Sequence, residues 1–196
     1  MLAQRDDIYT LRDELKSLRD ILEDYPSLED RLVGTGILRK ETASVLGCLG
    51  YVGKASGLEF DVRVHAPTAP WGQLAIEPVV HRSGDVMARV LVRLDEIEQS
   101  LSLIYRLIDR YQPEGEACMA LPAASDRLGL ASVEGWRGET VHYVRMNADG
   151  TIARWFPRDP SWLNWPALEQ LIEGNIVPDF PVCNKSVNGS YSGHDL

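Results

Sequence analysis

Residues 84–111, GDVMARVLVRLDEIEQSLSLIYRLIDRY, decide the fold of this chain. Val86, Val90 and Leu94 open an apolar stripe with helical spacing, and Ser83 is the expected N-cap. Further leucines widen the stripe beyond one face of the helix. A helix this broadly apolar is predicted to lie at the centre of the molecule, with neighbours on several sides.

The sequence before this helix predicts more helices and then a long loop. Residues 5–24 alternate charged side chains with apolar ones at spacings of three and four, which predicts an amphipathic helix. Residues 27–50 are broken by glycines into short helical pieces. Residues 51–82 carry several prolines and predict a loop-rich stretch. Loops of this length in compact domains are usually functional or covered by another surface.

The sequence after the central helix favours strands. Residues 130–136 and 140–156 are rich in β-branched and aromatic side chains, and Asn147-Ala-Asp-Gly150 is a strong turn signal. A short helix is predicted near residues 167–173. The last twenty or so residues, rich in Pro, Asn, Gly and Ser, predict an extended tail.

These elements predict a mainly helical α+β fold. A helix bundle is expected around residues 84–111, with an appended antiparallel β-hairpin near residues 130–157. We assign residues 1–115 to the helical core part and residues 116–196 to the hairpin and tail, together forming one structural domain.

Composition excludes two classes of partner. The chain has 196 residues, 44% of them hydrophobic, which is typical of a folded protein. Its formal charge of −9 and the lack of a basic stripe exclude a nucleic-acid surface. No apolar stretch reaches the roughly 18–20 residues that span a bilayer, so direct membrane insertion is not expected. Cys48, Cys118 and Cys183 are single and far apart, which favours a reducing cytoplasm.

Four local patterns follow one another along the chain. They are Gly34-Thr-Gly-Ile-Leu38 with Asp61-Val-Arg63, Gly84-Asp85 with Arg89, Arg93 and Glu96, Glu134-Gly-Trp-Arg-Gly138 with His142, and Pro160-Ser-Trp-Leu-Asn164 with Pro166. In this order they resemble the large subunit of energy-converting nickel–iron (NiFe) hydrogenases of the formate hydrogenlyase type, and the homologous quinone-site subunit of respiratory complex I, the NADH-quinone oxidoreductase. The resemblance covers nearly the whole chain and implies the C-terminal part of a NiFe-hydrogenase large-subunit-like helix bundle.

The C-terminal sequence departs from the hydrogenase pattern. Hydrogenases of this family end in Asp-Pro-Cys-x-x-Cys, whose thiolates hold nickel and iron. Ser190 and Gly193 stand at these two positions here, and neither hydroxyl nor glycine replaces a soft thiolate. The family's other cysteine pair, in Arg-x-Cys-Gly-x-Cys, is absent from the chain. A nickel–iron centre is therefore not expected, and no cofactor or metal is assigned to this chain. His194 and Asp195, with Cys183 or His142, remain a minor alternative for a metal site.

The resemblance implies a set of residues around the former active-site cavity. They are Arg137, His142, Arg89, Arg93, Glu96, Asp61 and Arg63. Arg137 matches the arginine that hydrogenases place over the metal, but a pairing with Glu134 or Asp61 is the favoured interpretation. A half-buried structural role is favoured for His142. Arg89, Arg93 and Glu96 fit an internal network and a solvated helix face equally well.

The function implied by the resemblance is that of a subunit in a membrane-associated, multi-subunit oxidoreductase. Such a subunit lies on the cytoplasmic side, peripheral to the inner face of the membrane, beside an iron–sulfur subunit and membrane-arm subunits. Iron–sulfur clusters would belong to the partner, a quinone is a possible ligand, and the isolated chain is expected to be inactive. The family's N-terminal portion has no counterpart before residue 5.

The alternative is a non-catalytic structural or assembly module derived from a hydrogenase large subunit. A ligand-sized cavity near Arg93, Arg137 and the tail would favour the oxidoreductase subunit. A filled core at that place would favour the structural module.

Overall fold

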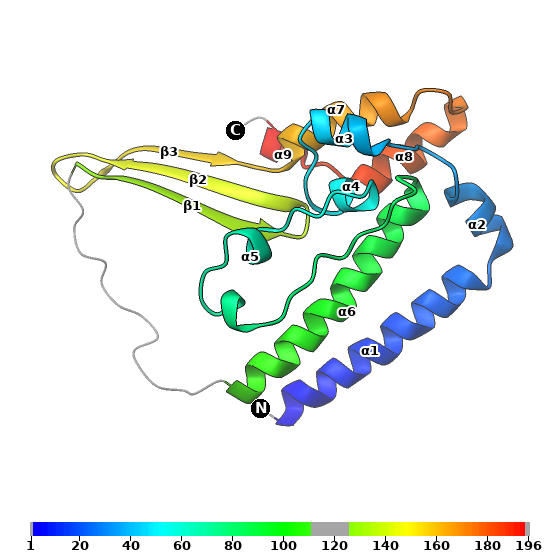
Figure 1. Cartoon of the computed structure of the whole chain (residues 1–196), viewed down its shortest axis with the longest axis horizontal. Coiled ribbons are helices and arrows are strands. Elements are labelled where there is room, and N and C mark those ends of the chain that lie inside the picture. The colour runs from blue at the N-terminus through cyan, green and yellow to red at the C-terminus, as the bar shows by residue number, and fades with distance from the viewer. Residues whose placement is uncertain (1, 111–125, 195–196) are drawn as a thin grey trace.

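The computed structural model describes residues 2–110 and 126–194 of the 196-residue chain. Two long helices, α1 (Leu2–Glu23) and α6 (Val86–Arg110), lie side by side and run in opposite directions (Figure 1). The shorter elements are α2 (Pro26–Leu32), α3 (Lys40–Val45), α4 (Gly50–Ala55), α5 (Val62–His65), α7 (Ser161–Leu171), α8 (Phe180–Val187), α9 (Tyr191–His194) and the 3-10 turns η1 (Trp71–Gln73) and η2 (Val177–Asp179). Among the described residues, no helix is both long and apolar enough to cross a membrane.

The central helix α6 lies within two residues of the predicted ends. The predicted N-cap is wrong, because Asp85 rather than Ser83 caps the helix. The Asp85 carboxylate accepts a hydrogen bond from the backbone N–H of Ala88 at 2.8 Å, and the Ser83 hydroxyl donates to the same carboxylate. A negative charge at this end of a helix is also favoured by the helix dipole.

The main hydrophobic core draws on both parts of the chain that the sequence separated. Its buried members from the N-terminal part include Leu38, Tyr51 and Val92, and those from the C-terminal part include Leu171 and Val187. They pack α4, α6, α7 and α8 against one another. A second, smaller cluster fixes α1 to α6 through Ile8, Leu15 and Leu101. The predicted boundary between residues 115 and 116, and Cys118, lie outside the described residues.

The predicted hairpin is part of a three-stranded antiparallel sheet. Its strands are β1 (Leu128–Gly135), β2 (Gly138–Met146) and β3 (Ile152–Arg158), in the order β1-β2-β3. The sheet projects from the helical body (Figure 1). At its base the β1–β2 turn touches α4 backbone to backbone: a Cβ on Gly50 would lie 2.3 Å from the carbonyl of Arg137, and one on Gly138 would lie 2.7 Å from the Gly50 nitrogen.

Two expectations about irregular segments are wrong. The C-terminal tail is helical rather than extended, because Cys183 and Val187 of α8 bury their side chains in the main core. Asn188, in a left-handed conformation, ends α8. The predicted loop also starts too early, because residues 51–55 continue α4 and are buried beneath α6. The predicted short helix near residues 167–173 is the second half of α7 and its end.

Candidate functional site

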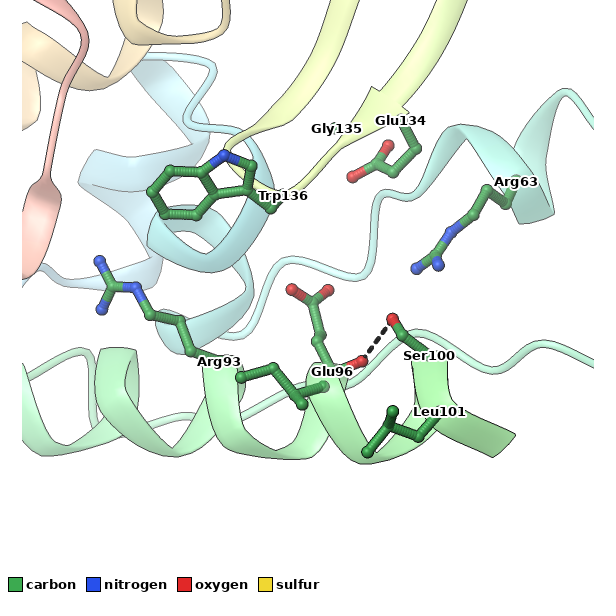
Figure 2. A pocket seen from close by; sticks show the side chains of 9 residues that line it. Arg63, Arg93, Glu96, Ser100, Leu101, Glu134, Gly135 and Trp136 are labelled. Carbon is green, nitrogen blue, oxygen red and sulfur yellow. Dashed lines mark hydrogen bonds between the residues drawn. The ribbon is translucent and has the colours of Figure 1, made fainter. Parts of the chain in front are cut away.

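A cavity of about 550 Å³ lies between α5, the middle of α6 and the β1–β2 turn. It is lined by Arg63, Arg93, Glu96, Ile97, Ser100, Leu101, Glu134, Gly135 and Trp136. Figure 2 shows the carboxylates of Glu96 and Glu134 and the guanidinium of Arg63 converging on the same space. The cavity therefore joins a wall of apolar side chains to a few polar groups, as small-molecule sites commonly do.

Lys54 supplies a buried positive charge to these carboxylates. Its side chain is 2% exposed, and its ammonium lies 2.8 Å from Asp61, 2.6 Å from Glu96 and 3.5 Å from Glu134. Burial by itself lowers the pKa of Lys54, but Glu96 and the other two carboxylates outweigh it and raise that pKa. Lys54 is therefore a cation that ties α4 to α5, α6 and β1.

Asp61 is the N-cap of α5 and accepts several hydrogen bonds from cations and backbone. It accepts hydrogen bonds from the backbone N–H of Arg63 at 3.0 Å, from the Arg63 guanidinium at 2.7 Å and from Lys54 at 2.8 Å. Burial opposes its ionisation, but these hydrogen bonds prevail and lower the pKa of Asp61 to about 2. Asp61 is thus ionised at any physiological pH.

The pKa of Glu134 shifts in the opposite direction to that of Asp61. Its side chain is 5% exposed and accepts one hydrogen bond, from the backbone N–H of Val62 at 2.9 Å. Burial raises the pKa of Glu134, and the nearby charge of Asp61 acts in the same direction. Three carboxylates face two cations, Lys54 and Arg63, so a proton on Glu134 would make the group neutral. The arrangement can hold and exchange one proton at the edge of the cavity.

Two stacked aromatic rings, flanked by an arginine on each side, close the other side of the cavity. The guanidinium of Arg93 lies 3.7 Å from the ring centre of Tyr51, and Tyr51 stacks on Trp136 at 5.6 Å. The guanidinium of Arg137 lies 3.9 Å from the ring centre of Trp136. Such cation–π contacts are favourable, so the stack fixes Trp136 as a wall of the cavity although the indole is 52% exposed.

The structure places the predicted site residues in three different environments. Arg63, Arg93 and Glu96 line the cavity, and Asp61 lies directly behind Arg63. Arg89 is instead buried away from it, where it donates to the carbonyls of Gly36 and Gly84 and to the Ser186 hydroxyl. Burial lowers the pKa of Arg89 to about 10, which leaves it charged at neutral pH.

Arg137 and His142 are not among the residues that line the cavity. Arg137 donates from Nε to the carbonyl of Asn188 at 2.8 Å, and the expected ion pair with Glu134 or Asp61 is not formed. Glu134 faces Lys54 instead, because α4 brings that lysine beneath it. His142 lies on the sheet, where its ring stacks on Trp155 and accepts a hydrogen bond from the indole at 3.1 Å.

The C-terminal turn has no room for a nickel ligand at residue 193. A Cβ on Gly193 would lie 2.7 Å from Asp159 Cγ and 2.9 Å from Asp159 Cβ. The Ser190 hydroxyl accepts from the Gly193 N–H at 3.0 Å, and Trp162 donates to the Gly193 carbonyl at 2.7 Å. A hydroxyl and an occupied space do not fit the nickel–iron group, which needs thiolates here. The alternative with Asp195 falls partly outside the described residues, within which no three His, Cys, Asp or Glu side chains are grouped to hold a metal.

Lys54 is the functional residue that sequence reasoning missed, and Trp136 was noted only as part of a motif. The available signal was a lysine in the segment Gly50-Tyr-Val-Gly-Lys-Ala55, whose other residues are small or apolar. Every residue of that helix is buried. A charge in such a segment indicates buried carboxylates nearby.

The fold of this chain is found in subunits of membrane-bound respiratory complexes. The whole chain superimposes on a chain of the membrane-bound sulfane sulfur reductase, an archaeal respiratory membrane complex, with a TM-score of 0.90 and 30% identity. Residues 4–127 match the family described as respiratory-chain NADH dehydrogenase, 49 kDa subunit. The chain belongs to this family, which confirms the resemblance seen in its sequence.

Curated relatives of the chain are longer proteins. The chain is 29% identical to formate hydrogenlyase subunit 5 of Escherichia coli (strain K12), over 100% of this chain and 34% of the relative. It is 32% identical to the carbon monoxide-induced hydrogenase of Rhodospirillum rubrum, over 91% of this chain and 49% of the relative. The matched sulfane sulfur reductase chain is covered over 55% of its length. The chain thus spans about a third to a half of these relatives' length.

Proposed function

We propose that this chain is the C-terminal part of the large subunit of a membrane-associated, multi-subunit oxidoreductase that does not activate hydrogen. In this proposal it lies on the cytoplasmic face, beside an iron–sulfur subunit and membrane-arm subunits. The names of the relatives support the assembly, since they include a formate hydrogenlyase and a respiratory membrane complex.

The observation that carries the proposal is the C-terminal turn at Ser190 and Gly193. No thiolate stands at either position, and the Asp159 side chain occupies the space that a residue 193 side chain would need. Placing a cysteine there would force Asp159 to move, and crowding of this kind destabilises a packed structure. The turn therefore supports an oxidoreductase subunit that has given up metal chemistry at this place.

The cavity supports a role in binding a small, partly apolar acceptor such as a quinone. Arg63 offers hydrogen-bond donors to carbonyl oxygens, since its guanidinium has N–H groups beyond those that bind Asp61, while Ile97 and Leu101 offer apolar surface. Reduction of a quinone consumes protons as well as electrons, and Glu134 would hold a proton within the cavity wall. In the proposal, electrons come from the partner's iron–sulfur clusters.

The test is metal analysis of the native complex purified from its own cells, with its subunits identified by mass spectrometry. A nickel–iron hydrogenase prepared in parallel serves as the positive control. We expect iron, no stoichiometric nickel, and co-purified iron–sulfur and membrane subunits. Stoichiometric nickel in this complex would overturn the proposal.

A non-catalytic structural module is the second candidate, and the packing around Arg137 favours it. The cavity includes neither Arg137 nor the tail, and both are held by hydrogen bonds within the chain. Filling the cavity with Ser100→Trp separates the two candidates. An oxidoreductase subunit would lose quinone reduction in the assembled complex, whereas a structural module would keep it. Ile104→Trp, on the same helix but 47% exposed, is the matched control.

A further inference from the structure

The outer half of the projecting sheet carries an ordered surface on one of its faces. Two rows of cross-strand neighbours build it, and we call it the distal face. The first row is Leu128, Arg145 and Arg154, and the second is Leu130, Tyr143 and Phe156. Because cross-strand partners share a face, all six side chains point to the same side of the sheet. Figure 1 shows this half of the sheet extending beyond the helical body.

Two like charges stand directly opposite each other at the centre of the distal face. Arg145 pairs with Arg154 across β2 and β3, and both are exposed. Within residues 2–110 and 126–194, neither arginine forms an ion pair with a carboxylate. Like charges in this position destabilise a sheet. An anion seated between the two guanidinium groups would relieve that repulsion.

The space for such an anion is a hollow with an aromatic floor. Arg145, Arg154, Tyr143 and Phe156 line a depression of about 290 Å³. The Arg154 guanidinium lies 5.6 Å from the ring centre of Phe156, so the ring holds the arginine beside the hollow. Arginine can bind a carboxylate through two parallel hydrogen bonds.

Apolar side chains continue the distal face along the edge strand β1. Leu128 is 63% exposed and Leu130 is 71% exposed, and both lie on the edge strand β1. An exposed edge strand with apolar side chains invites association with another chain unless something covers it. Tyrosine, phenylalanine and arginine are enriched at protein interfaces.

We propose that the distal face docks a segment of a partner protein that places an acidic side chain between Arg145 and Arg154, with apolar residues beside it on Leu128 and Leu130. The proposal rests on the proposed membership of a multi-subunit complex, because it requires a partner polypeptide.

The first test is site-specific photocrosslinking in the complex purified from its own cells. A benzoylphenylalanine replaces Leu130, and in the control it replaces Val133, which is 59% exposed on the opposite face of β1. Mass spectrometry then identifies the crosslinked peptide. We expect the probe at residue 130, but not at 133, to mark a partner segment with Asp or Glu among apolar residues.

Each other outcome overturns the inference. The distal face has another occupant if the probe crosslinks to lipid, to this chain itself, to a second copy or to a segment without an acidic residue. If the probe forms no crosslink at all, the distal face is not covered in the complex. If partner subunits co-purify but the probe misses them, the distal face is wrong and the proposed function stands. If no partner polypeptide co-purifies at all, the proposed function fails as well.

Charge reversal tests the role of the arginines. Arg145→Glu with Arg154→Glu should lower the yield of the Leu130-probe crosslink about tenfold or more, and reversing the partner's acidic residue to Arg should restore it. Arg127→Glu makes half of that charge change at the residue just before β1, outside the distal face, and it should leave the yield unchanged. Failure of the partner's reversal to restore the crosslink would overturn the carboxylate contact.

Discussion

Arg89 and Lys54 are both cations buried within the helical body, but their partners differ in kind. Arg89 is fully buried and donates to two backbone carbonyls and a hydroxyl, all of them neutral. The Lys54 side chain is 2% exposed and faces three carboxylates from three different elements. Neutral acceptors have no second protonation state near neutral pH, so the arginine can only hold chain segments together. The carboxylates around the lysine can exchange protons, and two of them, Glu96 and Glu134, line the cavity, whereas Arg89 does not.

The largest effect is expected from Arg89→Met. The substitution takes the guanidinium away from the Gly36 carbonyl and the Ser186 hydroxyl, whereas the Gly84 carbonyl keeps its bond from the N–H of Leu38. We expect the free energy of unfolding to fall by about 4 kcal/mol. Urea unfolding of the 196-residue chain measures it, with Arg82→Met on an exposed side chain as the control. A loss below about 1 kcal/mol would contradict the structural role given to Arg89.

Lys54→Met should cost somewhat less, about 3 kcal/mol at pH 7. Its carboxylate neighbours can take up protons once the ammonium is gone, and that uptake limits the damage. Without Lys54 the pKa values of these acids rise in the folded state, so the folded form gains protons as pH falls. The deficit relative to the unmodified protein should therefore shrink between pH 7 and pH 5. Equal deficits at both pH values would show that the carboxylates do not titrate as a group.

Glu134→Gln should change stability by less than about 1 kcal/mol and alter its pH dependence. The raised folded-state pKa of Glu134 means that its contribution to stability falls as pH rises from the ordinary value of 4.5 through that raised pKa. Glutamine does not titrate, so the variant lacks this decline. Its free energy of unfolding should therefore rise relative to that of the parent as pH increases across this range. Asp61 affects stability at lower pH than Glu134 does, because the stability that Asp61 adds is lost only as pH falls from 3.8 to about 2.

The measurement for Glu134 is urea unfolding over a pH series, together with infrared spectroscopy over the same series. Because the pKa of Glu134 is raised, the carbonyl stretch of its protonated carboxyl should persist to higher pH in the parent than that of an ordinary glutamate, and it should be missing from Glu134→Gln. Glu139→Gln on the next strand is the comparison, since Glu139 is paired with Arg158. Parallel pH profiles for parent and Glu134→Gln would remove the proton-holding role from Glu134.

The smallest effect is expected from Glu98→Gln, in an ion pair near the surface between α1 and α6. Glu98 lies 3.2 Å from Arg12 and its side chain is 50% exposed, so water screens the attraction. We expect a change below about 0.5 kcal/mol by the same urea measurement. A larger loss would mean that burial does not explain why Lys54 and Arg89 contribute more to stability than exposed cations do.

The parts of the fold that the sequence predicted well are those with a repeating pattern. The apolar stripe of α6 and the turn Asn147–Gly150 depend on neighbours in the chain, so local spacing reveals them. The tail failed because its helix α8 is stabilised by distant contacts: Tyr51 donates to the carbonyl of Val187, and Ser186 accepts from Arg89. Such contacts across the chain have no local signature.

The candidate site was predicted only in part, because contacts between distant parts of the chain decide which residues meet there. The family resemblance predicted Arg63, Arg93 and Glu96, and all three line the cavity. It also predicted Arg89, which lies on the same helix but is buried against α8, where it binds Ser186. One turn of helix separates Arg89 from Arg93, and only the tertiary packing decides which of them lies beside open space. Lys54 could be suspected from its apolar neighbours, but its carboxylates could not be identified without the fold.

The contact between Gly50 and Gly138 sets the dimensions of the cavity. The sheet rests on the helical body with backbone against backbone, so no side chain acts as a spacer between them. Glu134 and Trp136, which line the cavity, are held within four residues of that contact. Substituting a side chain that faces the cavity would therefore change the surface offered to a ligand while the spacing between the sheet and the helical body stays the same.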